Sequence, residues 1–393
     1  MESGSTSLEQ NLSRIESAPC YSEAINAGLR NARERKSMWP SSVMRVVVRM
    51  GQALSKRRLA SALLGSRLAQ RMWAQPVSTD TVRILAYHRV LDVQKRAFPF
   101  DHDLISASSA LFRGQLRFVN DHFNVTSFED LARCEEQGRP WPDRGLIITF
   151  DDGYRDNLTH AYPILREMKL PATIFLATGH IGQSSLFWWD LIAYCMKQTN
   201  ERSVTFEEIS SIPLSLRTRR KRRAAVHHIL TWLKSVPEET KRSFLARYST
   251  KLGVDVPNDV ADGMHLSWDE VREMAANGIS FGSHTVTHPI LARVTPQQLT
   301  DEVVESKRTL ERELNKPAIA FSYPVGDSPN FNKLVEKCVA DAGFRYAVSY
   351  EEGIADAHLS DRYALPRLHV ETHDTIHEFK AKLMYPGLLL SRV

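Results

Sequence analysis

From Thr81 onward, short apolar runs alternate with longer segments of helical spacing. Val82 to Ala86 is a short, mostly apolar run, whereas Thr295 to Leu314 has the period of an amphipathic helix. Further short runs predict strands at Gly145 to Phe150, Ala172 to Ala177, Ile279 to Gly282, Ala318 to Ser322 and Tyr346 to Ser349. Because strands and helices alternate, the pattern predicts an α/β fold with a parallel sheet or barrel.

This alternation stops between Phe187 and Met264, where the patterns are mostly helical. We therefore interpret residues 187–264 as an insertion in the barrel. It contains a basic cluster made up of Arg217, Arg219, Arg220, Lys221, Arg222 and Arg223. Such a cluster fits a lid or a docking surface for a phosphate-bearing substrate, and it also fits a solvated helix face, which is the more common origin of a charge run.

Another basic segment precedes the first predicted strand. Residues 36–79 contain no Asp or Glu, and Arg45, Arg49 and Lys56 lie among apolar residues with helical spacing. We expect residues 1–79 to form a polar and basic helical extension. Residues 43–73 suit a helix that lies on an anionic membrane surface, and they also suit the more common solvated or barrel-packed helix.

Composition sets further limits on the chain. Its 393 residues are 42% hydrophobic and 25% charged, which leaves room for one large domain, predicted at 80–380, and a C-terminal tail at 381–393. The formal charge of +5 is modest for this length and gives no reason to expect a nucleic-acid partner. The 4 cysteines lie far apart in the sequence, so they predict neither a zinc knuckle nor a disulfide framework.

The first 35 residues are polar and carry Glu2, Glu9, Glu16 and Glu23, unlike the basic start and apolar run of an export signal. No early stretch approaches the ~20 apolar residues of a membrane span. We therefore expect a cytoplasmic protein, or one bound peripherally to the inner face of the membrane.

Two acidic residues follow the predicted strand at 145–150 in the sequence Asp151-Asp152-Gly153. Neighbouring side chains on an extended backbone point in opposite directions, so one carboxylate could bind a metal while the other faces a water or substrate. Taken alone, this sequence is also common in solvated turns.

Two histidines, His284 and His288, follow the predicted strand at 279–282 and lie four residues apart. Pro289 disfavours a helical conformation at His288, so we expect a turn here. Two imidazoles and one carboxylate form a recurrent open metal site, which makes metal binding a better interpretation than a pair of surface histidines.

With these residues in place, the sequence resembles the polysaccharide deacetylase family, also called the nodulation-deacetylase homology domain or carbohydrate esterase family 4. Thr149 to Gly153 and His284 to His288 are similar to its first two signature motifs. Three further segments agree in order, namely Ile84 to Val90, Pro171 to Leu176 and Ser267 to Glu270. The resemblance implies a distorted (β/α) barrel with fewer than eight units and a site at the carboxyl ends of its strands.

The resemblance also implies roles for individual residues. Asp152, His284 and His288 would bind the metal, and Asp151 would be the general base. His369, in a Leu-x-His type motif, would be the general acid that protonates the departing amine. Four residues would contact substrate, namely His88, Tyr323, Pro324 and Gly326.

The third family motif departs from its usual form, because Phe321 to Gly326 contains no Arg. Many members use an arginine there to hold the base, whereas some exopolysaccharide-type members have a Tyr-Pro-x-Gly form. We hypothesise that Arg367 supplies the missing guanidinium and keeps Asp151 ionised. A surface position for Arg367 is the alternative.

Together these features predict a metal-dependent hydrolase that removes N-acetyl groups from amino sugars in an oligosaccharide, a polysaccharide or a lipid-linked glycan. Zinc is the expected metal, although iron, nickel or cobalt would suit the same ligands. Hydrolysis of another linear or cyclic C–N bond is one alternative, and a non-catalytic glycan-binding or membrane-docked scaffold is another. Peptidoglycan is disfavoured as a substrate because reaching it would require export.

Overall fold

The computed structural model describes residues 80–93 and 98–385. The predicted extension at 1–79, its basic segment at 43–73 and residues 386–393 of the predicted tail lie outside this part of the chain. Within the described residues, no helix is both long enough and apolar enough to cross a membrane.

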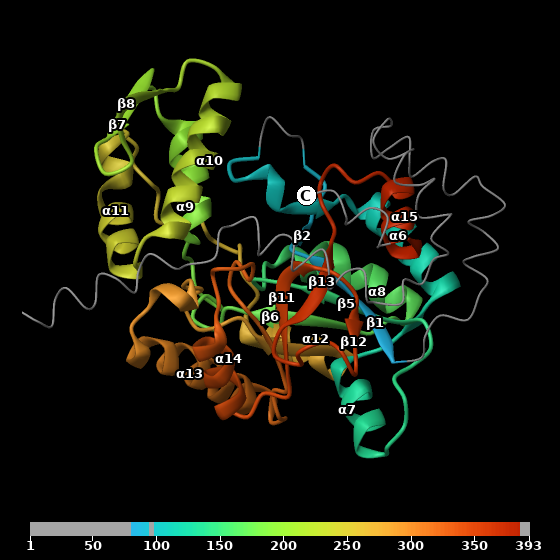
Figure 1. Cartoon of the computed structure of the whole chain (residues 1–393). Helices are drawn as coiled ribbons and strands as arrows, with labels where there is room; N and C mark the ends of the chain where they lie inside the picture. The colour runs from blue at the N-terminus through green and yellow to red at the C-terminus, as the bar shows by residue number, and fades with distance from the viewer. Residues whose placement is uncertain (1–79, 94–97, 386–393) are drawn as a thin grey trace, which may run out of the picture. The chain divides into compact units, whose positions relative to one another are not determined.

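A closed barrel of parallel strands forms the centre of the fold (Figure 1). Its strands are β1 (Thr81–Tyr87), β5 (Gly145–Phe150), β6 (Ala172–Leu176), β9 (Ile279–Ser283), β10 (Ala320–Ser322), β11 (Tyr346–Glu352) and β13 (Leu365–His369). They follow the order β1-β13-β11-β10-β9-β6-β5, and β5 pairs with β1 to close the ring. Seven parallel strands confirm the predicted distorted barrel with fewer than eight units.

Alternate residues along a barrel strand pack into two different apolar clusters. On β5, Ile147 packs with Val82 and Ile84 in one apolar cluster. Its neighbours Leu146 and Ile148 belong to the other cluster, which includes the outer helices. Both faces of the strand are therefore buried, which explains why the strand sequences are continuous apolar runs.

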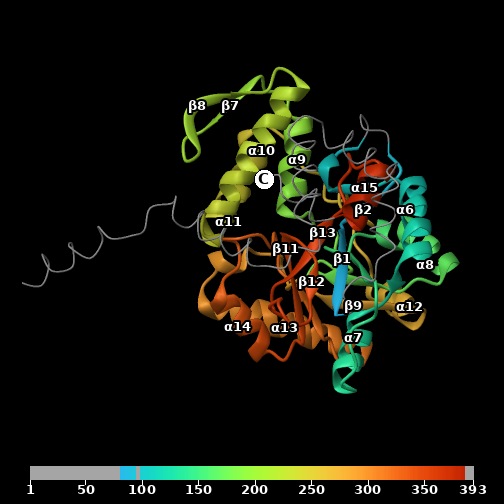
Figure 2. The ribbon, with the colours of Figure 1, turned by 45° about the vertical axis from the view of Figure 1, so that its right-hand side comes forward.

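Helices surround the barrel and begin at residues that the sequence marks clearly. The outer helices are α6 (Ser109–His122), α7 (Phe128–Glu136), α8 (Tyr162–Met168), α12 (Trp268–Ala276), α13 (Pro296–Leu314), α14 (Lys333–Asp341) and α15 (Ile376–Met384). Ser127, Ser267 and Thr375 form capping boxes at the starts of α7, α12 and α15. Helix α15 packs beside α6, as both ribbon views show (Figure 2).

Short elements complete the periphery. They are β2 (Arg89–Val90), β3 (Ile105–Ala107), β4 (Asn124–Val125), β12 (Ala355–Asp356), η1 (His102–Leu104), η2 (Asn157–Ala161) and η3 (Leu291–Arg293). Strand β4 extends the sheet beside β5, and β12 pairs with β1 in the antiparallel direction.

The segment at 187–264 forms a separate group of elements beside the barrel (Figures 1 and 2). It contains α9 (Trp188–Gln198), the hairpin of β7 (Ser203–Phe206) and β8 (Ser210–Ser215), α10 (Arg219–Ser235) and α11 (Glu238–Lys251). Its apolar core includes Ile229, Phe244 and Tyr248, and the same cluster also contains Tyr154 and Ala177 from loops that follow β5 and β6. The segment is therefore packed directly on the end of the barrel where these strands finish.

Candidate active site

The predicted chemical residues meet at the carboxyl ends of the barrel strands. Asp151 and Asp152 follow β5, His284 follows β9, and Arg367 lies near the end of β13. Parallel strands direct their carboxyl ends toward one edge of a barrel, which is why residues distant in sequence come together here. All four of these side chains are at least 98% buried.

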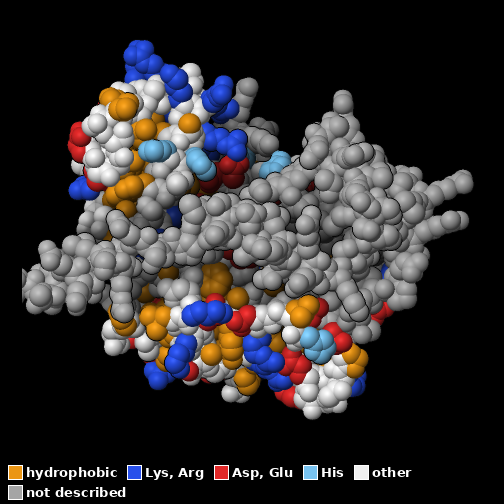
Figure 3. All heavy atoms as spheres, viewed as in Figure 1, with side chains coloured by type: hydrophobic (Ala, Val, Ile, Leu, Met, Phe, Trp, Pro, Cys, Tyr) orange, Lys and Arg blue, Asp and Glu red, His pale blue; other side chains and the backbone are white. Residues whose placement is uncertain are grey.

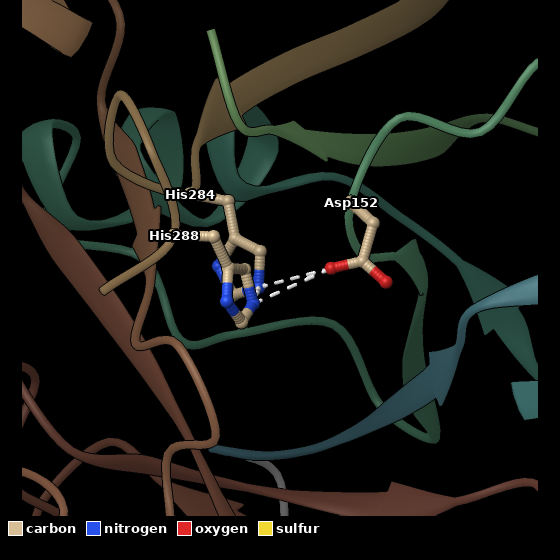
Figure 4. Close-up of side chains that lie close together, drawn as sticks. All are labelled: Asp152, His284 and His288. Carbon is tan, nitrogen blue, oxygen red and sulfur yellow. Dashed lines mark hydrogen bonds and ion pairs between the residues drawn. The ribbon is translucent and has the colours of Figure 1, made fainter. Parts of the chain in front are cut away.

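Asp152, His284 and His288 point toward one another (Figure 4). The Asp152 Oδ1 atom lies 3.5 Å from Nε2 of each histidine, and the two Nε2 atoms are 3.1 Å apart. Among the described residues, these three make up the group of histidine, cysteine or acidic side chains that could hold a metal ion, with ligand atoms all within 4.8 Å.

The protonation of this trio fits a cation. The Nδ1 atom of His284 lies 2.7 Å from the carbonyl oxygen of Ser322, so Nδ1 carries the proton and Nε2 presents its lone pair. Burial lowers the pKa of both histidines, which keeps them in the neutral form that binds metals. Burial and the neighbouring Asp151 raise the pKa of Asp152, and its Oδ2 atom has no hydrogen-bond partner within the described chain. A divalent cation would offset both effects, so the donor set fits a metal.

The loop that carries the histidines has an unusual backbone. Thr285 has φ 70° and His288 has φ 59°, which is the left-handed region that non-glycine residues rarely adopt. Asp152 likewise has φ 77°. As expected from Pro289, residues 284–290 form no helix. Strained backbone that persists at a site needs surrounding contacts to hold it.

Glu302 of α13 provides such contacts from beneath the histidine loop. Its carboxylate accepts hydrogen bonds from the backbone N–H groups of Val286 and Thr287, at 2.8 and 2.9 Å, and from the Thr287 hydroxyl at 2.5 Å. Thr285 Oγ1 also accepts a hydrogen bond of 3.0 Å from the backbone N–H of His288. No sequence signal marked Glu302, because a single acid on an amphipathic helix ordinarily faces solvent.

The glycine after the two acids is required by its surroundings. Gly153 has φ 79°, and a Cβ atom added there would lie 2.8 Å from Leu176 Cδ2 and 3.1 Å from Ile181 Cδ1. A side chain at this position would therefore displace the turn that directs Asp151 and Asp152 to opposite partners.

The Arg367 guanidinium lies against the Asp151 carboxylate. Two parallel hydrogen bonds join them, from Nη1 to Oδ1 at 2.8 Å and from Nη2 to Oδ2 at 2.7 Å. Nη2 also lies 3.2 Å from Ser322 Oγ, at the position where many relatives of the predicted family carry an arginine. The surface position considered for Arg367 is wrong, because its side chain is completely buried.

This pairing determines the charge of Asp151. Burial raises the pKa of the carboxyl group, but the nearby Arg367 and His284 lower it by more, so the net pKa lies well below its usual value. Asp151 is therefore ionised at neutral pH, while its neighbour Asp152 requires a cation to be stable as an anion.

The two histidines predicted near the substrate both contact Tyr350, but in different ways. His88 and Tyr350 both line the cavity at the site, with their rings edge to face and centroids 5.7 Å apart. His369 stacks flat on Tyr350 at 3.6 Å and is not among the lining residues. Burial lowers the pKa of His88 to about 4 and that of His369 to about 3.

Only some residues of the third motif, Phe321 to Gly326, line the cavity. Tyr323 lines the cavity, although its hydroxyl donates a hydrogen bond of 2.7 Å to the carbonyl oxygen of Tyr363. Pro324 and Gly326 are not among the lining residues, whereas Val325 between them is. Any contact with substrate from this motif therefore falls first to Tyr323 and Val325.

Comparison with known proteins agrees with this arrangement. The family model for polysaccharide deacetylases matches residues 138–347, which is more than half of the chain. The chain belongs to the polysaccharide deacetylase family. This confirms the resemblance drawn from the two signature motifs.

Individual relatives of this polysaccharide deacetylase are distant. YxkH of Bacillus subtilis (strain 168), whose name assigns it to polysaccharide deacetylases, is 22% identical over 299 residues, or 76% of this chain and 74% of that protein. The poly-β-1,6-N-acetyl-D-glucosamine N-deacetylase of Staphylococcus aureus (strain N315) is 32% identical over 89 residues, which are 22% of this chain and 30% of that enzyme. The Streptococcus pyogenes deacetylase PplD, solved in complex with acetate, has a TM-score of 0.51 at 21% identity, covers 79% of this chain and 99% of its own, and supports the barrel fold.

In this polysaccharide deacetylase the site opens into a cavity of about 300 Å³. One wall comes from the barrel, with Asp151, Asp152 and both metal-site histidines. The other wall comes from the segment at 187–264, through Trp188, Trp189, Leu230 and Lys234. A lid or docking surface was one interpretation of this segment, but these four residues were not predicted, because nothing in a helical segment indicates which of its faces meets the barrel.

Trp189 connects the segment to the metal site. Its ring lies 4.5 Å from that of His288, centroid to centroid, and its Nε1–H donates a 2.9 Å hydrogen bond to the Tyr154 hydroxyl. That hydroxyl in turn donates a 2.6 Å hydrogen bond to the buried Asp190. The adjacent aromatic residues Phe187 to Trp189 were the available signal, since exposed tryptophans are uncommon.

Substitution of Glu302 tests whether this residue supports the proposed metal site. We expect Glu302→Ala to weaken metal binding by roughly 10–100-fold, because the histidine loop would lose its three hydrogen bonds. Competition with a chelator measures the affinity. Glu305→Ala, on the same helix but exposed and paired only with Arg308, is the matched control and should bind metal normally. Equal metal affinity in both variants would contradict this role.

Proposed function

We propose that the chain is a divalent-metal-dependent hydrolase that removes the acetyl group from an N-acetylated amino sugar. The observation that carries this proposal is the separation of two adjacent carboxylates. Asp152 faces His284 and His288, whereas Asp151 is held by Arg367. One acid is thereby available to a metal and the other to a water molecule, which are the two requirements of metal-assisted amide hydrolysis.

Asp152, His284 and His288 would hold the metal, and zinc is the ion that we propose for this ligand set. When bound, the metal would polarise the acetyl carbonyl and lower the pKa of water. Iron, nickel and cobalt accept the same ligands, so metal analysis of the purified protein decides between them.

Asp151 would act as the general base. Its carboxylate is ionised and its two oxygens are oriented by Arg367, so it can accept the proton of the attacking water. The water oxygen bonds to the acetyl carbon and gives a tetrahedral intermediate. Arg367 contacts Asp151 rather than the cavity, and we assign it as a positioning residue.

The departing amine needs a proton, and the geometry favours His88 as its source over the His369 predicted at first. His88 lines the cavity, whereas His369 stacks on Tyr350 and is not among the lining residues. The charges agree with this choice. Burial is the largest cause of the lowered pKa of both rings, and Arg367 lowers both further, but Asp151 acts on His88 to raise its pKa. After proton transfer the C–N bond breaks, giving acetate and a free amino sugar.

The substrate that we propose is an N-acetylated glycan, in agreement with the name of the Staphylococcus aureus relative. A non-catalytic scaffold is the less favoured alternative, because such a protein would have no reason to keep Asp151 charged beside an intact ligand trio. A cytoplasmic location and attachment of residues 43–73 to an anionic membrane also remain proposals from the sequence.

The two carboxylates should respond differently to substitution. Asp152→Ala, His284→Ala and His288→Ala should each lose metal and acetate release together, since three ligands leave little redundancy. Asp151→Asn should keep its metal and lose roughly 10²–10⁴-fold in turnover, the usual contribution of a positioned base. Metal analysis and acetate release from N-acetylhexosamine oligomers, with and without a chelator, give the measurement. If Asp151→Asn lost metal while Asp152→Asn kept it, the two roles would be reversed.

Substitution of each histidine by alanine distinguishes the two candidates for the general acid. We expect His88→Ala to retain metal and lose roughly 10²–10⁴-fold in turnover. His369→Ala should have a much smaller effect, because it removes a ring that stacks on Tyr350 and lies 3.8 Å from Glu352, outside the cavity lining. The measurement is kcat with metal content as the control. The opposite order of effects would restore His369 as the acid.

Loss of Arg367 should be visible in the pH dependence of the reaction. Arg367→Ala removes the charge that lowers the pKa of Asp151, so that pKa should rise and the acidic limb of the kcat/KM profile should move to higher pH. Turnover should fall while metal is retained. Arg367→Lys should recover part of the effect, since an ammonium group cannot make the two-point contact. An unshifted acidic limb in Arg367→Ala would exclude this role.

A further inference from the structure

One face of α10 links the catalytic cavity to a second cavity. Leu230 and Lys234 line the catalytic cavity. Arg219, Arg223 and Val226, at intervals of three and four residues before them, line an adjoining cavity of about 670 Å³. Residues with this spacing share one side of a helix. A single helix face therefore runs from a cluster of arginines to the metal site, and Asp101 lines both cavities where they meet.

Helix α10 begins with positive side chains, whereas the start of a helix favours negative ones. Thr218 caps α10, the first turn contains no acid, and the helix begins with five consecutive basic residues, Arg219 to Arg223. The first turn of a helix carries a partial positive charge, which disfavours cations and attracts anions. Figure 3 shows Lys and Arg side chains gathered at the end of the segment that contains this helix.

Some of these cations are used by the fold and others are available. Arg222 donates hydrogen bonds to the carbonyl oxygens of Met196 and Glu201, and Arg223 is paired with Asp103. Arg219 and Lys234 are exposed, and neither has a hydrogen bond or ion pair to any residue that the structure describes. Arg222 and Arg223 thus hold α10 against its neighbours, while Arg219 and Lys234 present free charges at the two ends of the helix face.

We propose that this face of α10 binds, at Lys234, a phosphate or diphosphate group attached to the acetylated sugar, and that the rest of the face, toward Arg219, lies along what continues from that group. The proposal rests on the proposed deacetylase function and names its substrate class. The catalytic cavity of about 300 Å³ is at the lower end of the range for small-molecule sites, which suits one terminal sugar rather than the interior of a polymer. Lys234 lies beside that sugar.

The length of the face sets the reach of the anion. Arg219 and Lys234 are 15 residues apart on α10, which corresponds to about 22 Å of helix at ~1.5 Å per residue. A single phosphate would contact Lys234 alone. A diphosphate is also much shorter than this face, so it would contact Lys234 but not Arg219. The nucleoside or lipid attached to it would extend toward the arginines, and both kinds of compound present the same diphosphate chemistry.

The test compares charged and neutral substrates on the metal-loaded full chain. The neutral substrate is a short N-acetylhexosamine oligomer, and the charged ones are an N-acetylhexosamine 1-phosphate, a nucleotide diphosphate sugar and a lipid diphosphate sugar. We expect kcat/KM to be higher for the diphosphate substrates, and the preference to decrease with salt. Lys234→Gln should reduce the ratio of charged to neutral kcat/KM by roughly fivefold, as expected for loss of one exposed charge pair, and Arg219→Gln, farther from the diphosphate, should reduce it by less.

Arg220→Gln is the matched control, because Arg220 carries the same charge next to Arg219 but is not among the residues that line either cavity. It should keep the wild-type ratio. An equal ratio in the wild type and all three variants, with acetate released from the neutral oligomer, would overturn the diphosphate site and leave the deacetylase function intact. Failure to release acetate from any of these substrates with any divalent metal would count against the proposed function itself. The nucleotide and lipid arms identify which source of diphosphate is used.

Discussion

The ion pair between Arg367 and Asp151 is the interaction on which the arrangement of the site depends. A buried carboxylate is costly unless it is paired and hydrogen-bonded, and here both oxygens are engaged by one guanidinium. The same arginine donates to the Ser349 carbonyl oxygen and lies beside Thr149, so it also connects β13 with β11 and β5. Because Asp151 is held in this way, its neighbour Asp152 is directed to the histidines and the two acids acquire different chemistry.

The metal trio depends on a different kind of support. Its ligands lie on turns with left-handed backbone at Asp152, Thr285 and His288, and such conformations persist only where the surroundings hold them. Glu302 and the Ser322 carbonyl oxygen hold the histidine side, and Gly153 allows the turn on the acidic side. The strain and its support come from the same packed strands and helices, which is why an exposed loop could not carry this site.

The sequence predicted the barrel and the residues at its strand ends because apolar runs and the polar residues after them are local signals. Asp151, Asp152, His284 and His288 were found in this way, and the absence of an arginine at Ser322 pointed to Arg367. The position of His369, whose ring stacks on Tyr350, could not be predicted, since it depends on how β13 and β11 pack. The place of Lys234 in the cavity was also beyond prediction, because which face of an inserted helix meets the barrel is decided by tertiary contacts alone, and the aromatic residues around Trp189 indicated burial without a partner.

The wall of the cavity opposite the barrel is the part of the site that can select a substrate. In the proposed mechanism the barrel residues act on an acetamide group, and nothing in Asp151, Asp152 or the two histidines would distinguish one acetylated sugar from another. Selection must therefore come from the rest of the cavity, where the opposite wall is formed by Trp188, Leu230 and Lys234 of the segment at 187–264. Trp189 of that segment packs against the metal-site ring of His288. A substrate bound along α10 would thus press on a wall that also supports a metal ligand, and the contact between Trp189 and His288 is the route by which binding there would reach the metal site.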